Sequence, residues 1–162
     1  MAELTNMEQK IAEVIGLAQA AQGATQKIEK LVENDELRKT LQRMREEAVE
    51  TEERTTQVVE SFEGKKTAIL DKARETKQEA TEMMRTYLGS DADGLDGFEF
   101  LTMAEAAEAG HWEILGTLNE RARNAALGEV IHWATPVQRR HFAEARGGSM
   151  QLASEEDPNE LA

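Results

Sequence analysis

The sequence contains no cysteine, only two prolines, 4% aromatic residues and no long apolar run. Without cysteine the chain has no disulfide, no thiolate zinc site and no cysteine nucleophile. The shortage of aromatic residues and proline disfavours a β-sandwich or barrel and favours helices. No stretch of about 18 apolar residues and no signal-peptide pattern occurs, so we expect a cytoplasmic protein without a membrane partner.

The chain also has few basic residues for its length. Its 162 residues include 32 Asp and Glu against 19 Lys and Arg, which gives a formal net charge of −13. Nucleic acids and anionic membranes need clustered Lys and Arg, so we expect neither as the main partner. An acidic surface attracts cations, and the length suits one domain with a sizeable core.

Apolar and small residues recur at alternating spacings of four and three, which is the pattern of amphipathic helices. Capping boxes at Thr5-x-x-Glu8 and Thr102-x-x-Glu105 are predicted to begin the first and fourth helices, and Gly147-Gly148 to end the fifth. Pro136 either kinks the fifth helix or divides it. The helices predicted by these patterns cover residues 6–33, 36–62, 66–88, 102–123 and 125–146.

This arrangement predicts an all-α antiparallel bundle over residues 1–147, followed by a polar, acidic and disordered tail over 148–162. Residues 89–97 are expected to form an acidic linker. They do not form an EF-hand, because Leu95 and Asp96 stand where an oxygen ligand and the glycine are needed. Met83 and Met84 are expected in the core.

The fourth predicted helix carries two polar residues on its apolar stripe. The stripe runs through Leu101, Ala104 and Leu115 and places Glu108 and His111 on the inner side, one turn apart. A buried carboxylate is costly unless it is paired or binds a metal. Di-iron and di-manganese bundles use Glu and His at this spacing. The pattern therefore predicts metal ligands, with a hydrogen-bonded Glu–His pair as the alternative.

The fifth predicted helix offers a second, altered motif. On the stripe through Ala134 and Ala145, Gln138 and His141 face inward as Gln-x-x-His. His141 is a candidate ligand, although a core or partly exposed histidine is the alternative. Thr135-Pro136-Val137-Gln138 also fits a capping box with proline at the first helical position, in which case Gln138 caps a helix that restarts after Trp133.

Together with these motifs, the sequence resembles the ferritin-like superfamily, in particular small bacterial stress-induced proteins of that superfamily. The best match is residues 107–118, AEAGHWEILGTL, which is similar to the family's acidic-His-aromatic-Glu helix; weaker matches are residues 37–55 and 62–66. The resemblance implies an antiparallel four-helix bundle with an accessory helix, often dimeric. It also implies a di-metal centre and a link to oxidative or general stress.

A complete centre of this kind takes one Glu from each of two helices and Glu-x-x-His from each of the other two. In this chain the middle of the first two stripes carries no ligand: the residues there are Val14, Ala18, Ala21, Met44, Ala48 and Thr51. Glutamates beside the stripes, or matching the family's pattern, extend the candidate set. The predicted metal ligands are Glu108, His111, His141, Glu113, Glu47, Glu50 and Glu8. The site is either intact through these residues or degenerate, binding one metal weakly or none.

The leading hypothesis is a cytoplasmic, stress-associated ferritin-like protein that binds iron, or manganese or zinc in its place, as a homodimer or higher homo-oligomer. If a di-iron centre forms, the expected chemistry is oxidation of Fe²⁺ by O₂ or peroxide. The alternative is a metal-free helical scaffold or protein-interaction bundle. No Gly-rich phosphate loop and no Gly-x-Ser-x-Gly elbow is present in the sequence.

Overall fold

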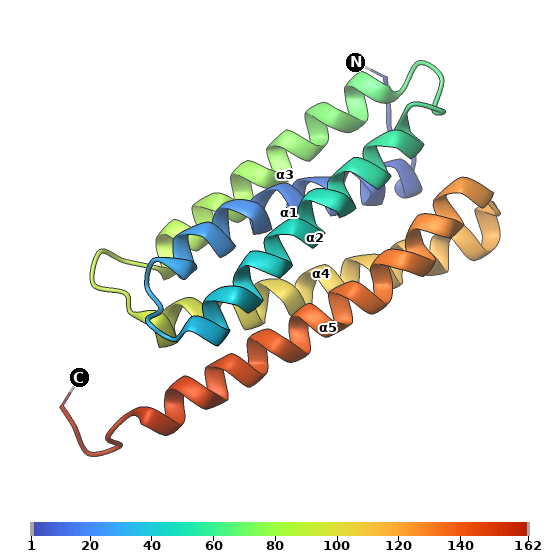
Figure 1. The fold of residues 1–162 in the computed structure, drawn as a ribbon. Helices are drawn as coiled ribbons and strands as arrows, with labels where there is room; N and C mark the ends of the chain where they lie inside the picture. The colour runs from blue at the N-terminus through green and yellow to red at the C-terminus, as the bar shows by residue number, and fades with distance from the viewer. Residues whose placement is uncertain (1, 162) are drawn as a thin grey trace.

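The computed structural model describes residues 2–161, which form five helices and no strand (Figure 1). The all-α prediction is confirmed. Successive helices run in opposite directions along one common axis (Figure 1). The helices are α1 (Asn6–Glu29), α2 (Asp35–Val59), α3 (Lys66–Tyr87), α4 (Gly94–Ala122) and α5 (Ala125–Glu155).

Four of the helices contact one another in a closed order. α1 packs against α2, α2 against α5, α5 against α4, and α4 against α1. α3 connects the α1–α2 pair to the α4–α5 pair and packs along α1 (Figure 1). No helix in the described part of the chain is long and apolar enough to cross a membrane.

Side-chain caps begin α1, α2, α4 and α5, whereas α3 begins without a side-chain cap hydrogen bond. The Thr5-x-x-Glu8 box is confirmed: Glu8 N donates to Thr5 Oγ1 at 3.2 Å, and Thr5 N donates to Glu8 Oε2 at 2.7 Å. Asn34 caps α2 by accepting from Leu37 N at 3.0 Å. These bonds satisfy backbone N–H groups that have no partner within the helix.

The fourth helix begins eight residues earlier than predicted. Its capping box is Asp93-x-x-Asp96, with Asp96 N donating to Asp93 Oδ1 at 2.9 Å and Asp93 N to Asp96 Oδ2 at 3.0 Å. The box predicted at Thr102 is wrong, because the Thr102 hydroxyl donates to Phe98 O inside the helix. The apolar residues before Thr102 are buried, which favours helix over the linker predicted to extend to residue 97.

The fifth helix does not end at Gly147-Gly148, as was predicted, but continues to Glu155. Gly148 is buried against Phe98, and a Cβ on Gly148 would collide with the Phe98 ring. The glycine is therefore a contact point between α4 and α5, and helix replaces the tail over residues 148–155. Pro136 lies inside this one continuous helix and does not divide it.

The core is built from two apolar clusters along the helix axes. One cluster contains Ile11, Ile15, Val59, Ile69, Trp112, Leu115 and Leu127; the other contains Ile28, Leu41, Met44, Phe98, Leu101 and Ala145. The stripes predicted for the first two helices lie in or between these clusters. Met84 is buried as predicted, but the prediction for Met83 is wrong, since its side chain is 68% exposed.

The close approach of α3 to α1 depends on Gly16. A Cβ at this position would lie 2.7 Å from Thr76 Cβ and would also strike the carbonyl oxygen of Ala73. Both neighbours are on α3, and one is rigid backbone. An added methyl group therefore forces the two helices apart.

We expect Gly16→Ala to lower the free energy of unfolding by roughly 1–3 kcal/mol, because overpacking displaces α3. Urea unfolding measures the change, and hydrogen exchange of α3 amides reports its loosening. The matched control is Gly23→Ala on the same helix, where a Cβ meets no atom within 4 Å. The control should stabilise by about 0.5–1 kcal/mol through helix propensity alone. Equal effects of the two substitutions would contradict this account.

Candidate functional site

A layer of polar side chains separates the two apolar clusters. It consists of Glu47 on α2, Glu105 and Glu108 on α4, and Gln138 and His141 on α5, and we call it the polar core cluster. All of these side chains are buried except Glu47, which is half-buried. Buried polar groups are unusual enough to need an explanation by pairing or by function.

Helix periodicity brings these side chains together. Glu105 and Glu108 lie one turn apart on α4, and Gln138 and His141 lie one turn apart on α5. α4 and α5 pack along each other, so the two pairs face across one interface. Where α1 and α2 lie beside these polar side chains, they present small or uncharged side chains, including Ala18 and Ala48.

His141 lies between two carboxylates from different helices. Its Nδ1 is 3.5 Å from Glu105 Oε2, and its Nε2 is 3.4 Å from Glu47 Oε1. Both ring nitrogens are therefore occupied by protein partners. The imidazole links α5 to α4 and to α2 at once.

Gln138 bridges the two glutamates of α4. With its amide oriented so that nitrogen faces the carboxylates, it donates to Glu105 Oε2 at 3.1 Å and to Glu108 Oε2 at 3.2 Å. One amide group can donate both bonds, because it carries two hydrogens. The bridge completes a polar path that runs Glu47–His141–Glu105–Gln138–Glu108.

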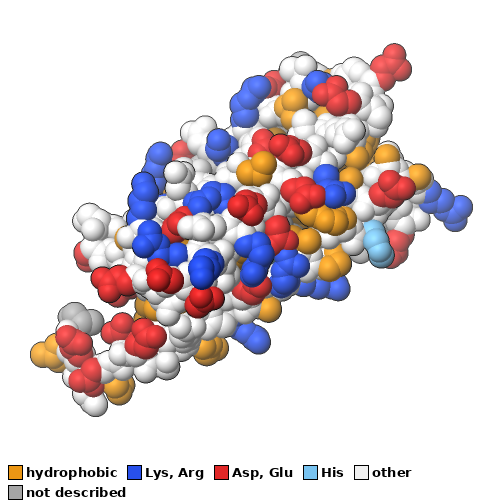
Figure 2. Space-filling view, viewed as in Figure 1, with side chains coloured by type: hydrophobic (Ala, Val, Ile, Leu, Met, Phe, Trp, Pro, Cys, Tyr) orange, Lys and Arg blue, Asp and Glu red, His pale blue; other side chains and the backbone are white. Residues whose placement is uncertain are grey.

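The outer end of this path reaches the protein surface through arginines. Arg140 donates to Glu47 Oε2, and Arg43 Nε lies 3.7 Å from Glu47 Oε1. Both arginines also pair with Glu144. Figure 2 shows basic and acidic side chains interspersed over the middle of this face, without a large patch of one sign.

The inner end of the path is poor in positive charge. Burial raises the pKa of Glu108 well above its usual value, and the nearby Glu105 raises it further. Since no Lys or Arg contacts Glu108 in the described structure, its carboxyl group favours the protonated form.

The opposite holds at the outer end. Burial alone would raise the pKa of Glu47, but the hydrogen bond from Arg140 and the charges of His141 and Arg140 lower it. Burial would likewise lower the pKa of His141, but Glu105 and Glu47 outweigh burial and raise it. The cluster therefore favours an ionised outer half and a protonated carboxyl at its inner end.

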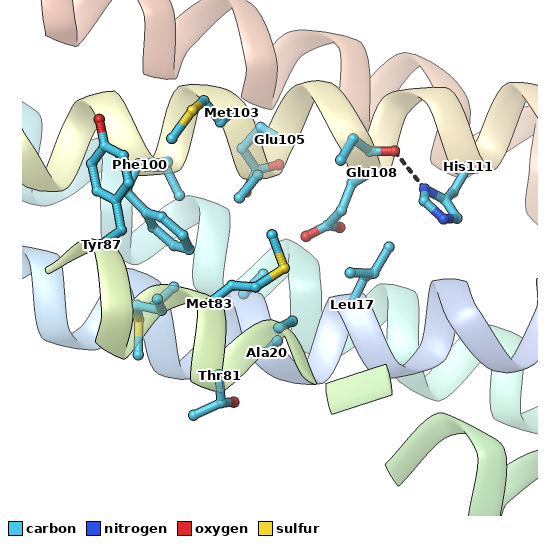
Figure 3. Close-up of a pocket in the computed structure, with 17 residues that line it drawn as sticks. Leu17, Ala20, Thr81, Met83, Tyr87, Phe100, Met103, Glu105, Glu108 and His111 are labelled. Carbon is cyan, nitrogen blue, oxygen red and sulfur yellow. Dashed lines mark hydrogen bonds between the residues drawn. The ribbon is translucent and has the colours of Figure 1, made fainter. Parts of the chain in front are cut away.

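Glu108 also borders a cavity. The space lies between α1, α3 and α4 and has a volume of about 370 Å³ (Figure 3). The carboxyl group of Glu108 points into it, facing Leu17 of α1 and Met83 of α3 (Figure 3). The polar core cluster is thus connected to a space large enough for a small molecule.

The structure brings together three of the seven predicted ligands. Glu108, His141 and Glu47 belong to the polar core cluster, although Gln138 and Glu105 stand between Glu108 and the other two. Glu105 belongs to the same cluster but was not among the predicted ligands. The prediction that Gln138 caps a restarted helix is wrong, because α5 is continuous and Gln138 is buried.

The other four predicted ligands lie outside the polar core cluster, although His111 borders the same cavity as Glu108. His111 is half-exposed, with Nδ1 donating to Ala107 O at 2.7 Å and Nε2 lying 3.2 Å from Glu13 Oε2. The remaining three ligands also have partners outside the polar core cluster, so the four predicted ligands do not converge on one site. Glu113 pairs with Arg139 at 2.9 Å, Glu50 with Arg54 at 2.6 Å, and Glu8 with the Thr5 cap and, at 3.8 Å, with Lys65.

The donor set does not fit a di-metal centre. Among residues 2–161 no group of three or more His, Asp or Glu side chains is placed to hold a metal ion. Both nitrogens of His141 face carboxylates, and a neutral amide stands where the second Glu-x-x-His motif needs a carboxylate. Comparisons with protein families, curated proteins and solved structures find no match to this chain.

We expect His141→Ala to lower the free energy of unfolding by roughly 3–5 kcal/mol, because it leaves the buried Glu105 without its positive partner. His111→Ala is the matched control on the neighbouring helix. Its pair with Glu13 is half-exposed, so the loss should stay below about 1 kcal/mol. Urea unfolding at pH 7 compares the variants. Equal losses would show that His141 has no special role in the core.

Glu108→Gln should change how stability depends on pH. A carboxyl whose pKa is raised in the folded state binds its proton more tightly there than in the unfolded chain. Its contribution is therefore fully present below its ordinary pKa of 4.5 and is lost as pH rises through the folded pKa. The glutamine variant has no such loss.

Urea unfolding at pH 4.5, 6, 7.5 and 9 should show the Glu108→Gln variant gaining stability relative to the parent as pH rises. Glu113→Gln, an exposed change on the same helix, serves as the control and should follow the parent curve. Parallel curves for the parent and Glu108→Gln would refute the raised pKa.

Proposed function

We propose that this chain is a ferritin-like helical bundle in which a metal-free polar cluster replaces the di-metal centre. On this proposal the protein acts as a binding protein and not as an Fe²⁺ oxidase. The observation that carries the proposal is the occupation of both His141 nitrogens by Glu105 and Glu47. Both nitrogens of a histidine held in this way already face carboxylates, so a metal would have to displace one of these two contacts.

The helix arrangement supports the ferritin-like part of the proposal. α1 and α2 form one antiparallel pair, and α4 and α5 form another (Figure 1). α3 follows the first pair in the chain, runs back along α1 and leads to the second pair. A four-helix bundle with one long crossover connection is the arrangement of ferritin-like proteins. α3 would then be the accessory helix and would replace an extended crossover loop.

The residues of the polar layer support the loss of the metals. α1 presents Ala18 and Ala21 at this level, and α2 presents Ala48 beside the half-buried Glu47. A complete centre needs carboxylates from both of these helices. Protons, an amide and an imidazole take the place of metal charge here, since they neutralise or pair the buried carboxylates.

The competing proposal retains one divalent cation, iron or else manganese or zinc, at Glu105 and Glu108. It is favoured by the position of these two carboxyl groups, one turn apart on α4 and both bordering the cavity. Iron oxidation would need further ligands that the described residues do not bring to this place. Self-association as a dimer and a role in stress remain predictions under either proposal.

Metal analysis separates the two proposals. Protein purified without chelator should contain less than about 0.2 equivalents of iron, manganese or zinc, also after incubation with each metal and desalting. Glu108→Gln and His111→Gln should have the same low content. About one equivalent in the parent, retained in His111→Gln but lost in Glu108→Gln, would overturn the metal-free proposal in favour of the single-cation site.

A further inference from the structure

The cavity beside Glu108 is apolar over most of its surface. Leu17 and Ala21 of α1, Met84 of α3 and Leu101 of α4 contribute to its lining. Its volume of about 370 Å³ falls in the range of pockets that hold small molecules, about 300–1,000 Å³. Among residues 2–161, the ionisable groups that line it are Glu105, Glu108, His111 and Tyr87.

The rim of the cavity exposes large apolar side chains. Met83 is 68% exposed, Met103 51% and Tyr87 46%, and all three contribute to the lining. Exposed apolar groups gathered at one opening are typical of a ligand or partner site. Methionine side chains adapt their shape to different apolar molecules, so this rim suits a flexible hydrocarbon chain.

The charges around the cavity favour a cation. Glu108 is 4% exposed and points into the cavity, and its hydrogen-bond partner within the described part of the chain is the neutral Gln138 amide. Glu105, its neighbour, also borders the cavity. At the surface, Glu79 and Glu82 line a depression that shares Met83 and Tyr87 with the rim. An incoming cation is therefore attracted at the opening and finds a carboxyl group without a charged partner inside.

We propose that this cavity binds a small molecule with an apolar chain and a protonated amine. The ammonium group is held by the carboxyl groups of Glu108 and Glu105, and the chain lies against Leu17, Met84 and Leu101. This inference rests on the proposed function as a binding protein and adds that the ligand is an apolar amine. Because the raised pKa of Glu108 favours a protonated carboxyl group, binding of the ammonium ion releases this proton, and the ammonium ion then supplies the positive charge that stabilises the carboxylate.

The same features disfavour other small ligands. A fatty acid would bring its carboxylate to a place where no Lys or Arg among the described lining residues can pair with it. An alcohol carries no positive charge, so it would lack the Coulombic attraction between an ammonium ion and a carboxylate and would therefore bind more weakly. A bare metal ion would find few oxygen ligands, because Glu105 and Glu108 are the carboxylates of the described lining and most of its other residues are apolar.

Isothermal titration calorimetry with three probes of equal chain length tests the proposal on the full chain. n-Octylamine should bind, n-octanol should bind at least roughly tenfold more weakly, and n-octanoate should not bind measurably. Glu108→Gln retains size and removes the charge. It should weaken octylamine binding by roughly tenfold or more and leave octanol binding unchanged.

Two further variants complete the experiment. Glu113→Gln removes an exposed carboxylate from the same helix, outside the cavity, and should bind octylamine like the parent. Ala104→Leu adds bulk to the lining and should abolish binding of octylamine and octanol, with an unchanged circular dichroism spectrum. These results together would assign the amine to the cavity and its charge recognition to Glu108.

Three outcomes would overturn the inference. The first is that octanoate or octanol binds as tightly as octylamine, and the second is that Glu108→Gln leaves the octylamine affinity unchanged. The third is that no probe binds to the folded protein, which would happen if a second copy of the chain covered the rim. Light scattering identifies that last cause. Metal content is measured separately: stoichiometric metal overturns the proposed function, whereas metal-free protein that ignores octylamine overturns only this inference.

Discussion

The contact of His141 with Glu105 and Glu47 is the constraint on which the interior depends. Each carboxylate would be costly to bury alone, and so would a charged imidazole. Together they connect α5 to α4 on one side and to α2 on the other. Sliding either neighbouring helix along its axis would separate His141 from the carboxylate that this helix supplies. The contact therefore fixes how the helices are aligned along their axes.

The two apolar clusters perform the complementary task. They lie on both sides of the polar layer and contain the largest fully buried side chains, Trp112 and Phe98 among them. Hydrophobic burial stabilises the assembly but tolerates several alignments of amphipathic helices. The polar layer is specific about alignment and contributes little net stability, because desolvation offsets the attraction of its charges. Stability and alignment thus come from different layers of one core.

The sequence predicts the helices well because periodicity and capping are local properties. It predicts the site less well because the rotation of a helix is decided by its neighbours. Two stripes through α4 share Leu101, Glu108 and Leu115. One passes through Ala104 and His111, the other through Glu105 and Trp112, and the structure buries the second. The large aromatic side chain of Trp112 favours burial of the second stripe. A prediction based on that stripe would have placed Glu105 in the core.

The end of α5 shows a second limit of local patterns. Two consecutive glycines are poor helix formers, and their positions predict a helix end. In the structure the absence of a side chain at Gly148 lets the helix approach Phe98 closely, and the packing gained keeps α5 helical to Glu155. A contact between residues 50 positions apart cannot be deduced from the sequence around either one.

The cavity follows from the way α3 is attached. Gly16 allows α3 to lie very close to α1, and Leu88 is buried just beyond the end of α3. A helix that packs along one neighbour leaves a groove beside it, and here α4 forms the far wall of that groove. Apolar residues of α3 that would be buried in a tighter arrangement, Met83 and Tyr87, therefore remain at the rim. Glu108 of α4 lines this groove. The attachment of α3 therefore also leaves one end of the polar layer accessible to a ligand.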